Sequence, residues 1–76
     1  STNLPYHIVA GCFMIRGNAQ RFVEKLKEQN FPASIIGQNN RGLHIVSIGN
    51  YARREEASNE LARIRPSNPE VWLLKK

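Results

Sequence analysis

The imidazoles of His7 and His44 and the thiol of Cys12 are the side chains best suited by type to acid–base or nucleophilic chemistry. If the first strand alternates regularly, Cys12 points to the opposite face from His7, so the two do not form a nucleophile and its base. The sequence has no Asp and no Gly-x-Ser-x-Gly, His-Glu-x-x-His or P-loop pattern. Cys12 has no Cys or His neighbour at zinc-site spacing. We therefore expect a protein that is not an enzyme and uses no metal ion or cofactor.

The charge balance favours a polyanionic partner. Eleven basic and six acidic side chains give a formal net charge of +5. This excess suits nucleic acid, an anionic membrane surface or an anionic wall polymer, and it does not choose among them. A chain of 76 residues forms one domain at most, with little volume for a deep cleft beside its core. A single cysteine cannot form an internal disulfide, so no redox compartment is implied.

The first half of the sequence reads as a strand followed by a helix. Residues 6–13 are rich in β-branched and aromatic side chains, which favours a strand. We expect Asn18 to be the helix N-cap. The apolar side chains after it recur at the spacing of one helix face, and they are Ala19, Phe22, Val23 and Leu26. Pro32 ends the helix, because proline disfavours helical geometry in the residue before it.

The rest of the sequence reads as strand, turn, strand, helix and strand. We expect strands over residues 33–36, 43–48 and 71–74, a polar turn over 37–42 and a helix over about 53–65. Gly49 and Asn50 are expected to break the third strand. The order predicts an α+β fold of the split βαβ kind (βαββαβ, ferredoxin- or RNP-like). Right-handed crossovers place both helices on one face of a four-stranded antiparallel sheet and leave the other face open.

The two halves repeat one pattern at an offset of 38 residues. Gly11 and Phe13 close the first strand as Gly49 and Tyr51 close the third. The helix positions match as well, with Ala19 and Ala57, Val23 and Leu61, and Leu26 and Ile64 as pairs. We expect each glycine to let the strand end bend and each aromatic ring to wedge against the next helix. Each small alanine then lets its helix approach the sheet.

Several segments in register resemble the SPOR (sporulation-related repeat) domain family. Residues 6–13 resemble its first-strand motif, an aromatic-led strand that ends Gly-Ser-Phe. Residues 42–51 resemble its third strand, often Gly-Leu-Tyr-Arg-Val-x-Val-Gly-x-Phe. Residues 18–27 resemble its first helix and residues 54–57 the entry to its second, so the likeness covers nearly the whole chain.

This resemblance implies a βαββαβ fold and binding to bacterial peptidoglycan, typically to glycan strands stripped of stem peptides at the division septum. It implies a non-catalytic domain in the periplasm or cell envelope, whose partners are glycan strands and other envelope or division proteins. Three positions differ from the usual family residues, with Val9 for Gln, Ile45 for Arg and Cys12 for Ser. Positions that are usually polar in the family, in the middle of the strands, are thus apolar in this sequence.

Alternation along the expected strands predicts which side chains look away from the helices. If Ile8, Ala10 and Cys12 face the helices, Gly11 faces away from them. The open face then carries the side chains that we predict to bind glycan, which are His7, Val9, Ile36, Leu43, Ile45, Ser47 and Trp72. This patch is apolar, which in a soluble protein indicates an interaction surface.

Two kinds of side chain around this patch suit a sugar polymer. The ring of Trp72 can lie flat against the C–H face of a pyranose, and tryptophan is a frequent anchor at recognition sites. Arg41 and Arg16, which we place near the rim, can meet the carboxylates of muramic acid. Such ion pairs weaken as salt is added.

Two other functions fit the same fold. The apolar open face also suits a protein–protein interaction or dimerisation module. RNA-binding RRM modules share this element order, and Arg41 with Gly42 resembles the start of their RNP1 motif. Leu43, Ile45 and Ser47 follow where that motif has aromatic side chains, so the platform that stacks bases is missing and nucleic acid is the weakest expectation.

For domain organisation, we expect a linker over residues 1–5 and a single domain over residues 6–76. No window has the 18 or more apolar residues that span a bilayer. Membrane anchoring would therefore depend on segments outside this sequence.

Overall fold

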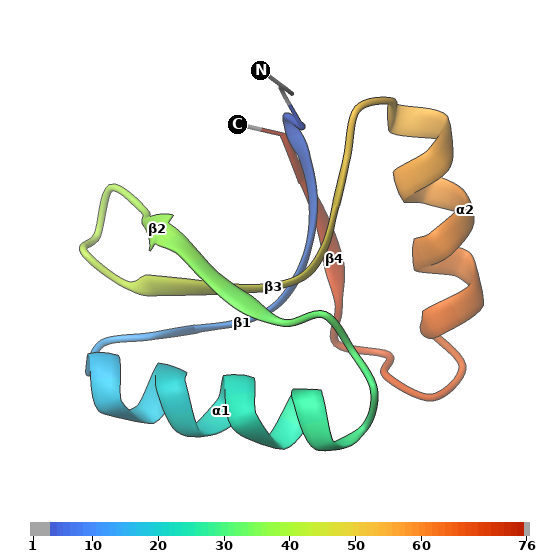
Figure 1. Ribbon diagram of the computed structural model, residues 1–76. Coiled ribbons are helices and arrows are strands. Elements are labelled where there is room, and N and C mark those ends of the chain that lie inside the picture. Colours follow the sequence, from blue (N-terminus) through green and yellow to red (C-terminus); the bar gives the residue numbers. More distant parts are fainter. Residues whose placement is uncertain (1–3, 76) are drawn as a thin grey trace.

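The computed structural model describes residues 4–75 and has two helices and a four-stranded sheet, as predicted (Figure 1). The elements are β1 (Tyr6–Phe13), α1 (Arg16–Glu28), β2 (Ser34–Gln38), β3 (His44–Tyr51), α2 (Arg54–Ile64) and β4 (Trp72–Lys75). All neighbouring strands are antiparallel and their order is β2-β3-β1-β4, so the expected split βαβ fold is confirmed. Residues 1–3 of the expected linker, and residue 76 of the expected domain, lie outside the described residues.

The ends of α1 differ from the sequence expectation. The N-cap is Ile15, which has extended backbone angles and makes no side-chain capping bond, so the prediction of Asn18 was wrong. The Ile15 carbonyl already accepts the amides of Asn18 and Ala19, which lie inside the first turn. At the other end Asn30 adopts a φ of 69°, and the Phe31 and Asn30 amides donate to the carbonyls of Leu26 and Lys27. This Schellman arrangement ends the helix before Pro32 acts.

The third strand continues through the residues that were expected to break it. Gly49 and Asn50 pair with Ile8 and His7, and the strand ends only at Tyr51. The strand has a glycine at position 49 because the Tyr51 ring lies against the backbone there. A Cβ on Gly49 would be 2.6 Å from the Tyr51 hydroxyl oxygen. The glycine therefore allows close packing of an aromatic ring without ending the strand.

Irregularities in the central strands bend the sheet. Ala10 in β1 and Ile48 in β3 are extra residues where the register between these strands shifts, and they stand 38 residues apart, so the irregularity belongs to the repeat. Such bulges bend a strand and increase its twist. Figure 1 shows both strands bent, with α1 and α2 on the outer side of the bend. We call the sheet face turned away from the helices the inner face.

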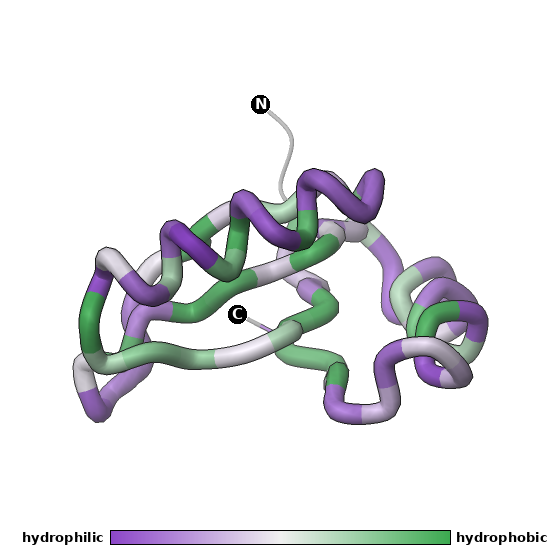
Figure 2. Tube along the Cα trace, turned by 90° about the horizontal axis from the view of Figure 1, so that it is seen from below, coloured by the Kyte–Doolittle hydropathy of each residue, from purple (hydrophilic) through white to green (hydrophobic). Residues whose placement is uncertain are grey.

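The hydrophobic core lies between the sheet and the helices. Its buried side chains come from every layer and are Ile8, Ala10, Ala19, Val23, Leu26, Ala33, Val46, Ile48 and Val71. Figure 2 shows the hydrophobic positions of α1 turned toward the strands and its hydrophilic positions turned outward. The helix periodicity in the sequence therefore marked the buried side of α1 correctly.

The internal repeat has the packing role that was expected of it. Ala19 and Ala57 are both fully buried where their helices meet the sheet. The Phe13 ring lies against Phe22 of α1, with ring centroids 5.1 Å apart. A Cβ on Gly11 would be 3.2 Å from the Phe13 ring, so Gly11 admits an aromatic ring as Gly49 does.

Candidate functional site

The strand register assigns side chains to the inner face in three rows. The first row is Leu74, His7 and Asn50; the second is Trp72, Val9, Ser47 and Ser34; the third is Cys12, Ile45 and Gly37. Side chains directly opposite each other on paired strands share a face, so each row runs across the sheet on one side. No Lys, Arg, Asp or Glu occurs in these three rows.

Five of the predicted binding residues share this face: His7, Val9, Ile45, Ser47 and Trp72. Four of them are buried, because they lie at the inside of the bend and neighbouring side chains cover them. Their exposed fractions are 8% for His7, 0% for Val9, 4% for Ile45 and 0% for Ser47. The side chains at the centre of the predicted patch therefore form a buried floor of the inner face. A bound molecule would contact the more exposed side chains at the edges of this floor.

Trp72 is the large exposed side chain of the inner face. It stands opposite Val9 in the register and is 40% exposed. Its neighbour Leu73 stands opposite Ile8, on the helix side. The alternation proposed for this apolar segment therefore agrees with the register, and an indole ring is available to a ligand.

The prediction that Cys12 faces the helices and Gly11 faces away was wrong. Cys12 pairs with Ile45 on the inner face, whereas the side of Gly11 that a Cβ would occupy faces the rings of Phe13 and Phe22. The bulge at Ala10 is the reason, since one extra residue inverts the alternation after it. Burial raises the pKa of the half-buried Cys12 thiol, which disfavours the nucleophilic thiolate.

Ile36 and Leu43 stand at the margins of the face. Ile36 is the extra residue where the register of β2 with β3 shifts, so alternation does not assign its half-buried side chain to a face. Leu43 is half-buried just before β3, and its amide donates to Asn39 Oδ1. It lies two residues before Ile45, which by alternation puts it on the same face.

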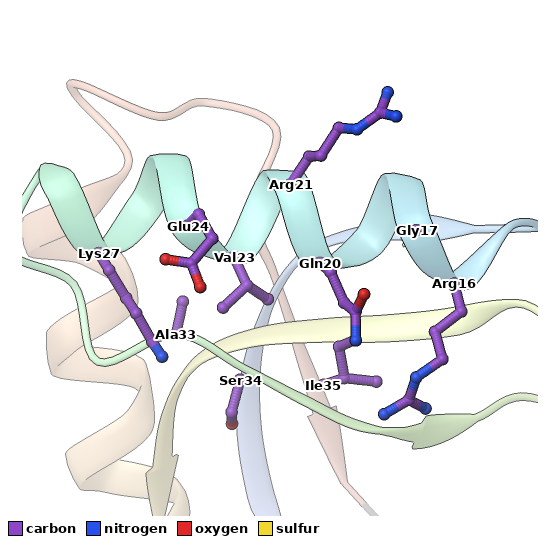
Figure 3. A pocket seen from close by; sticks show the side chains of 10 residues that line it. All are labelled: Arg16, Gly17, Gln20, Arg21, Val23, Glu24, Lys27, Ala33, Ser34 and Ile35. Carbon is purple, nitrogen blue, oxygen red and sulfur yellow. The ribbon is translucent and has the colours of Figure 1, made fainter.

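The two predicted rim arginines occupy different places. Arg41 is exposed in the turn between β2 and β3, and the Asn39 side chain holds that turn by accepting the Arg41 amide at 2.9 Å. Arg16 is the first residue of α1 and lines a cleft between α1 and β2 on the helix side (Figure 3). Arg41 therefore lies in the turn at one end of the sheet, whereas Arg16 lies on the helix side.

Polar side chains dominate the cleft between α1 and β2. Figure 3 shows Arg16 and Lys27 at its two ends and Arg21 turned outward. Ser34 points away from α1 there, in agreement with its place in the second row of the inner face. A second cleft near α2 contains Tyr51, whose pKa is raised by burial and by the Glu60 carboxylate.

A hydrogen-bonded group that the sequence did not reveal links the first two rows. His7 Nδ1 lies 2.5 Å from Asn50 Oδ1, and the Ser47 hydroxyl is 3.1 Å from the same oxygen. Asn50 is exposed, while His7 and Ser47 are buried. The sequence prediction omits Asn50 because it ends the third strand at residue 48, before Gly49. The repeat carries a signal for a strand at this position, since Asn50 stands 38 residues after Cys12 of the first strand, but it does not assign the face.

Comparison with known proteins identifies the family. The SPOR domain model matches residues 5–75. The chain belongs to the SPOR domain family. No curated protein and no solved structure matches the chain. In the part of the chain that the structure describes, neither helix has the length and apolar character needed to cross a bilayer.

SPOR domains are peptidoglycan-binding modules of bacterial envelope and cell-division proteins, and the family is one of binding rather than catalytic domains. The resemblance noted from residues 6–74 is thereby confirmed over nearly the whole chain.

Proposed function

We propose that this SPOR domain binds peptidoglycan glycan strands through the inner face of its sheet, without catalysing a reaction. The observation that carries the proposal is Trp72, a 40% exposed indole that belongs to three rows of side chains containing no Lys, Arg, Asp or Glu. Sugar rings present apolar C–H faces and neutral hydroxyl and amide groups. Such a ligand needs an aromatic surface and neutral hydrogen-bonding groups, and the inner face has both.

The preferred ligand is a strand stripped of its stem peptides, at the septum or elsewhere in the periplasmic envelope. Removing a stem peptide leaves a free carboxylate on the muramic acid. Arg41 is exposed at the end of the sheet where the third row lies, so its guanidinium is available to such a carboxylate. Intact stem peptides would also crowd the inside of a bent sheet.

Retention on cell-wall sacculi tests this proposal. The purified domain is incubated with intact sacculi and with sacculi treated with an amidase that removes stem peptides. We expect enrichment on the stripped glycan and a loss of about tenfold or more in affinity for Trp72→Ala, since an aromatic anchor in a binding site is commonly worth 2 kcal/mol or more.

Met14→Ala is the matched control, because Met14 is a large apolar side chain, 79% exposed, in the turn between β1 and α1, and belongs to none of the three rows. It should bind like the wild type. If the folded domain is retained on neither kind of sacculus at low salt, the proposal is wrong, and a protein partner becomes the candidate.

A further inference from the structure

The side-chain amide of Asn50 is held in one orientation on the inner face. His7 Nδ1 is 2.5 Å and Ser47 Oγ is 3.1 Å from Asn50 Oδ1. With the ring proton of His7 on Nδ1, the imidazole donates to this oxygen, and the single proton of the Ser47 hydroxyl is shared between it and the Gly49 carbonyl oxygen at 2.9 Å. The Nδ2 group then points away from both and makes no hydrogen bond within residues 4–75.

The two groups that hold Asn50 are themselves fixed. Ser47 is fully buried, and its Oγ accepts the Gly49 amide at 3.2 Å. His7 is 8% exposed and stands between Leu74 and Asn50 in the first row. Because Asn50 is already oriented, a ligand that takes its two N–H groups loses little conformational entropy in ordering them.

We propose that Asn50 Nδ2 donates a hydrogen bond to the carbonyl oxygen of an N-acetyl group on the bound glycan. This inference rests on the proposed function. The three rows of the inner face hold no Lys or Arg, so the acceptor that suits this donor is neutral rather than a carboxylate. An amide carbonyl is the strongest neutral acceptor on these sugars, and each sugar of the strand carries one.

The bond would make Asn50 a specificity-determining residue. A site with a placed polar group discriminates against an analogue that leaves this group unpaired. Glycan without acetyl groups would still offer its C–H faces to Trp72, but it would have no acetyl carbonyl oxygen to accept the hydrogen bond from Asn50. The domain should therefore distinguish N-acetylated from de-N-acetylated glycan.

Affinity measurements on three forms of one ligand test this inference. Peptide-free glycan strands are used as isolated, after chemical de-N-acetylation, and after re-acetylation, which controls for damage to the chains. We expect the wild type to bind the acetylated forms about tenfold more tightly, as for one hydrogen bond left unmade. Asn50→Ala should bind all three forms equally, near the weaker wild-type value.

Two further variants separate the donor from other effects. Asn50→Asp keeps an acceptor for His7 and Ser47 but has no N–H, so it should also lose the preference, including at high salt where its charge is screened. Asn59→Ala removes an exposed asparagine of α2, on the helix side, and should keep the preference. Thermal unfolding followed by circular dichroism confirms that each variant is folded.

The outcomes are distinct. If Asn50→Ala keeps the wild-type preference, or weakens binding to all three forms by the same factor, Asn50 does not recognise the acetyl group and the inference is wrong. If the wild type binds none of the three forms, the proposed function fails, and this inference fails with it.

Discussion

At the scale of single residues, burial decides the role of the inner-face side chains. Val9 and Ile45 stand where the family often has polar residues, and both are buried inside the bend. Their replacement therefore changes the floor of the face and removes little accessible polar surface. The side chains left accessible are at the edges, and Trp72 and Asn50 are the two exposed ones.

Cys12 provides a direct probe of this face. Because burial raises the pKa of its thiol, we expect iodoacetamide to react at neutral pH more slowly than with a small free thiol. The rate should rise with pH and reach half its maximum above the ordinary thiol pKa of about 8.5. Mass spectrometry of the alkylated protein at several pH values gives these rates.

Urea-unfolded protein is the control for the alkylation, and it should react at the rate of a free thiol. Saturating peptide-free glycan should slow the reaction of the folded domain further, since Cys12 lies in the third row of the inner face. Unchanged alkylation at saturation would argue that the glycan occupies another surface.

At the scale of elements, the repeated glycine and aromatic pairs connect each strand end to the core. Gly49 admits the Tyr51 ring and Gly11 admits the Phe13 ring, and each ring also belongs to the hydrophobic packing beneath the sheet. Because the bulges at Ala10 and Ile48 stand directly before these glycines, each strand bends and receives its aromatic ring within a few residues.

Gly49→Ala tests this packing. Its Cβ would lie 2.6 Å from the Tyr51 hydroxyl oxygen and 2.9 Å from Cε2 of the ring, so the ring must move. We expect a loss of about 1–3 kcal/mol in the free energy of unfolding, as for overpacked cores. Urea denaturation followed by circular dichroism measures it.

The matched substitution is Gly17→Ala in the first turn of α1, where an added Cβ meets nothing within 4 Å. This variant should gain about 0.4–1 kcal/mol, because alanine restricts the unfolded chain more than glycine does. Equal stability of the two variants would contradict the packing role of Gly49.

At the scale of the whole molecule, the Lys and Arg side chains lie outside the three rows of the inner face. The formal net charge is +5, yet the three rows of the inner face contain no Lys or Arg. Arg16, Arg21 and Lys27 belong to α1 or the cleft beside it. In the proposed mode of binding, long-range attraction to an anionic polymer would therefore come from the periphery, and contact with sugar would come from neutral groups.

Binding to stripped glycan should consequently depend weakly on salt. We expect affinity to fall by about two- to fivefold as sodium chloride is raised from 0.05 to 0.5 M, the range expected for exposed ion pairs. Arg41→Gln should remove much of this dependence, because Arg41 is exposed in the turn that joins the two strands carrying Gly37 and Ile45 of the third row. Microscale thermophoresis with peptide-free glycan gives the affinities.

Arg54→Gln is the control for the salt experiment, since Arg54 is exposed at the start of α2 on the helix side. It removes the same charge from the molecule away from the proposed site. A salt dependence that is equally reduced in both variants would mean that only net charge matters, and that Arg41 has no specific role.

The sequence by itself determined the order of elements, the family and the buried sides of the helices. These features follow from local signals, such as helix periodicity around Ala19 and Val23, and from the repeat that relates Gly11 to Gly49. It also placed Trp72 on the open face, because β4 is regular and pairs in register with β1.

Only the tertiary structure decided which side chains of that face are accessible. The bulge at Ala10 inverts the alternation, so it moves Cys12 to the inner face and Gly11 to the helix side, and strand periodicity cannot reveal one extra residue. The bend buries Val9, Ile45 and Ser47, which depends on how the paired strands curve together. The bond of Asn50 to His7 exists because β1 and β3 pair, and this contact spans 43 positions of the chain.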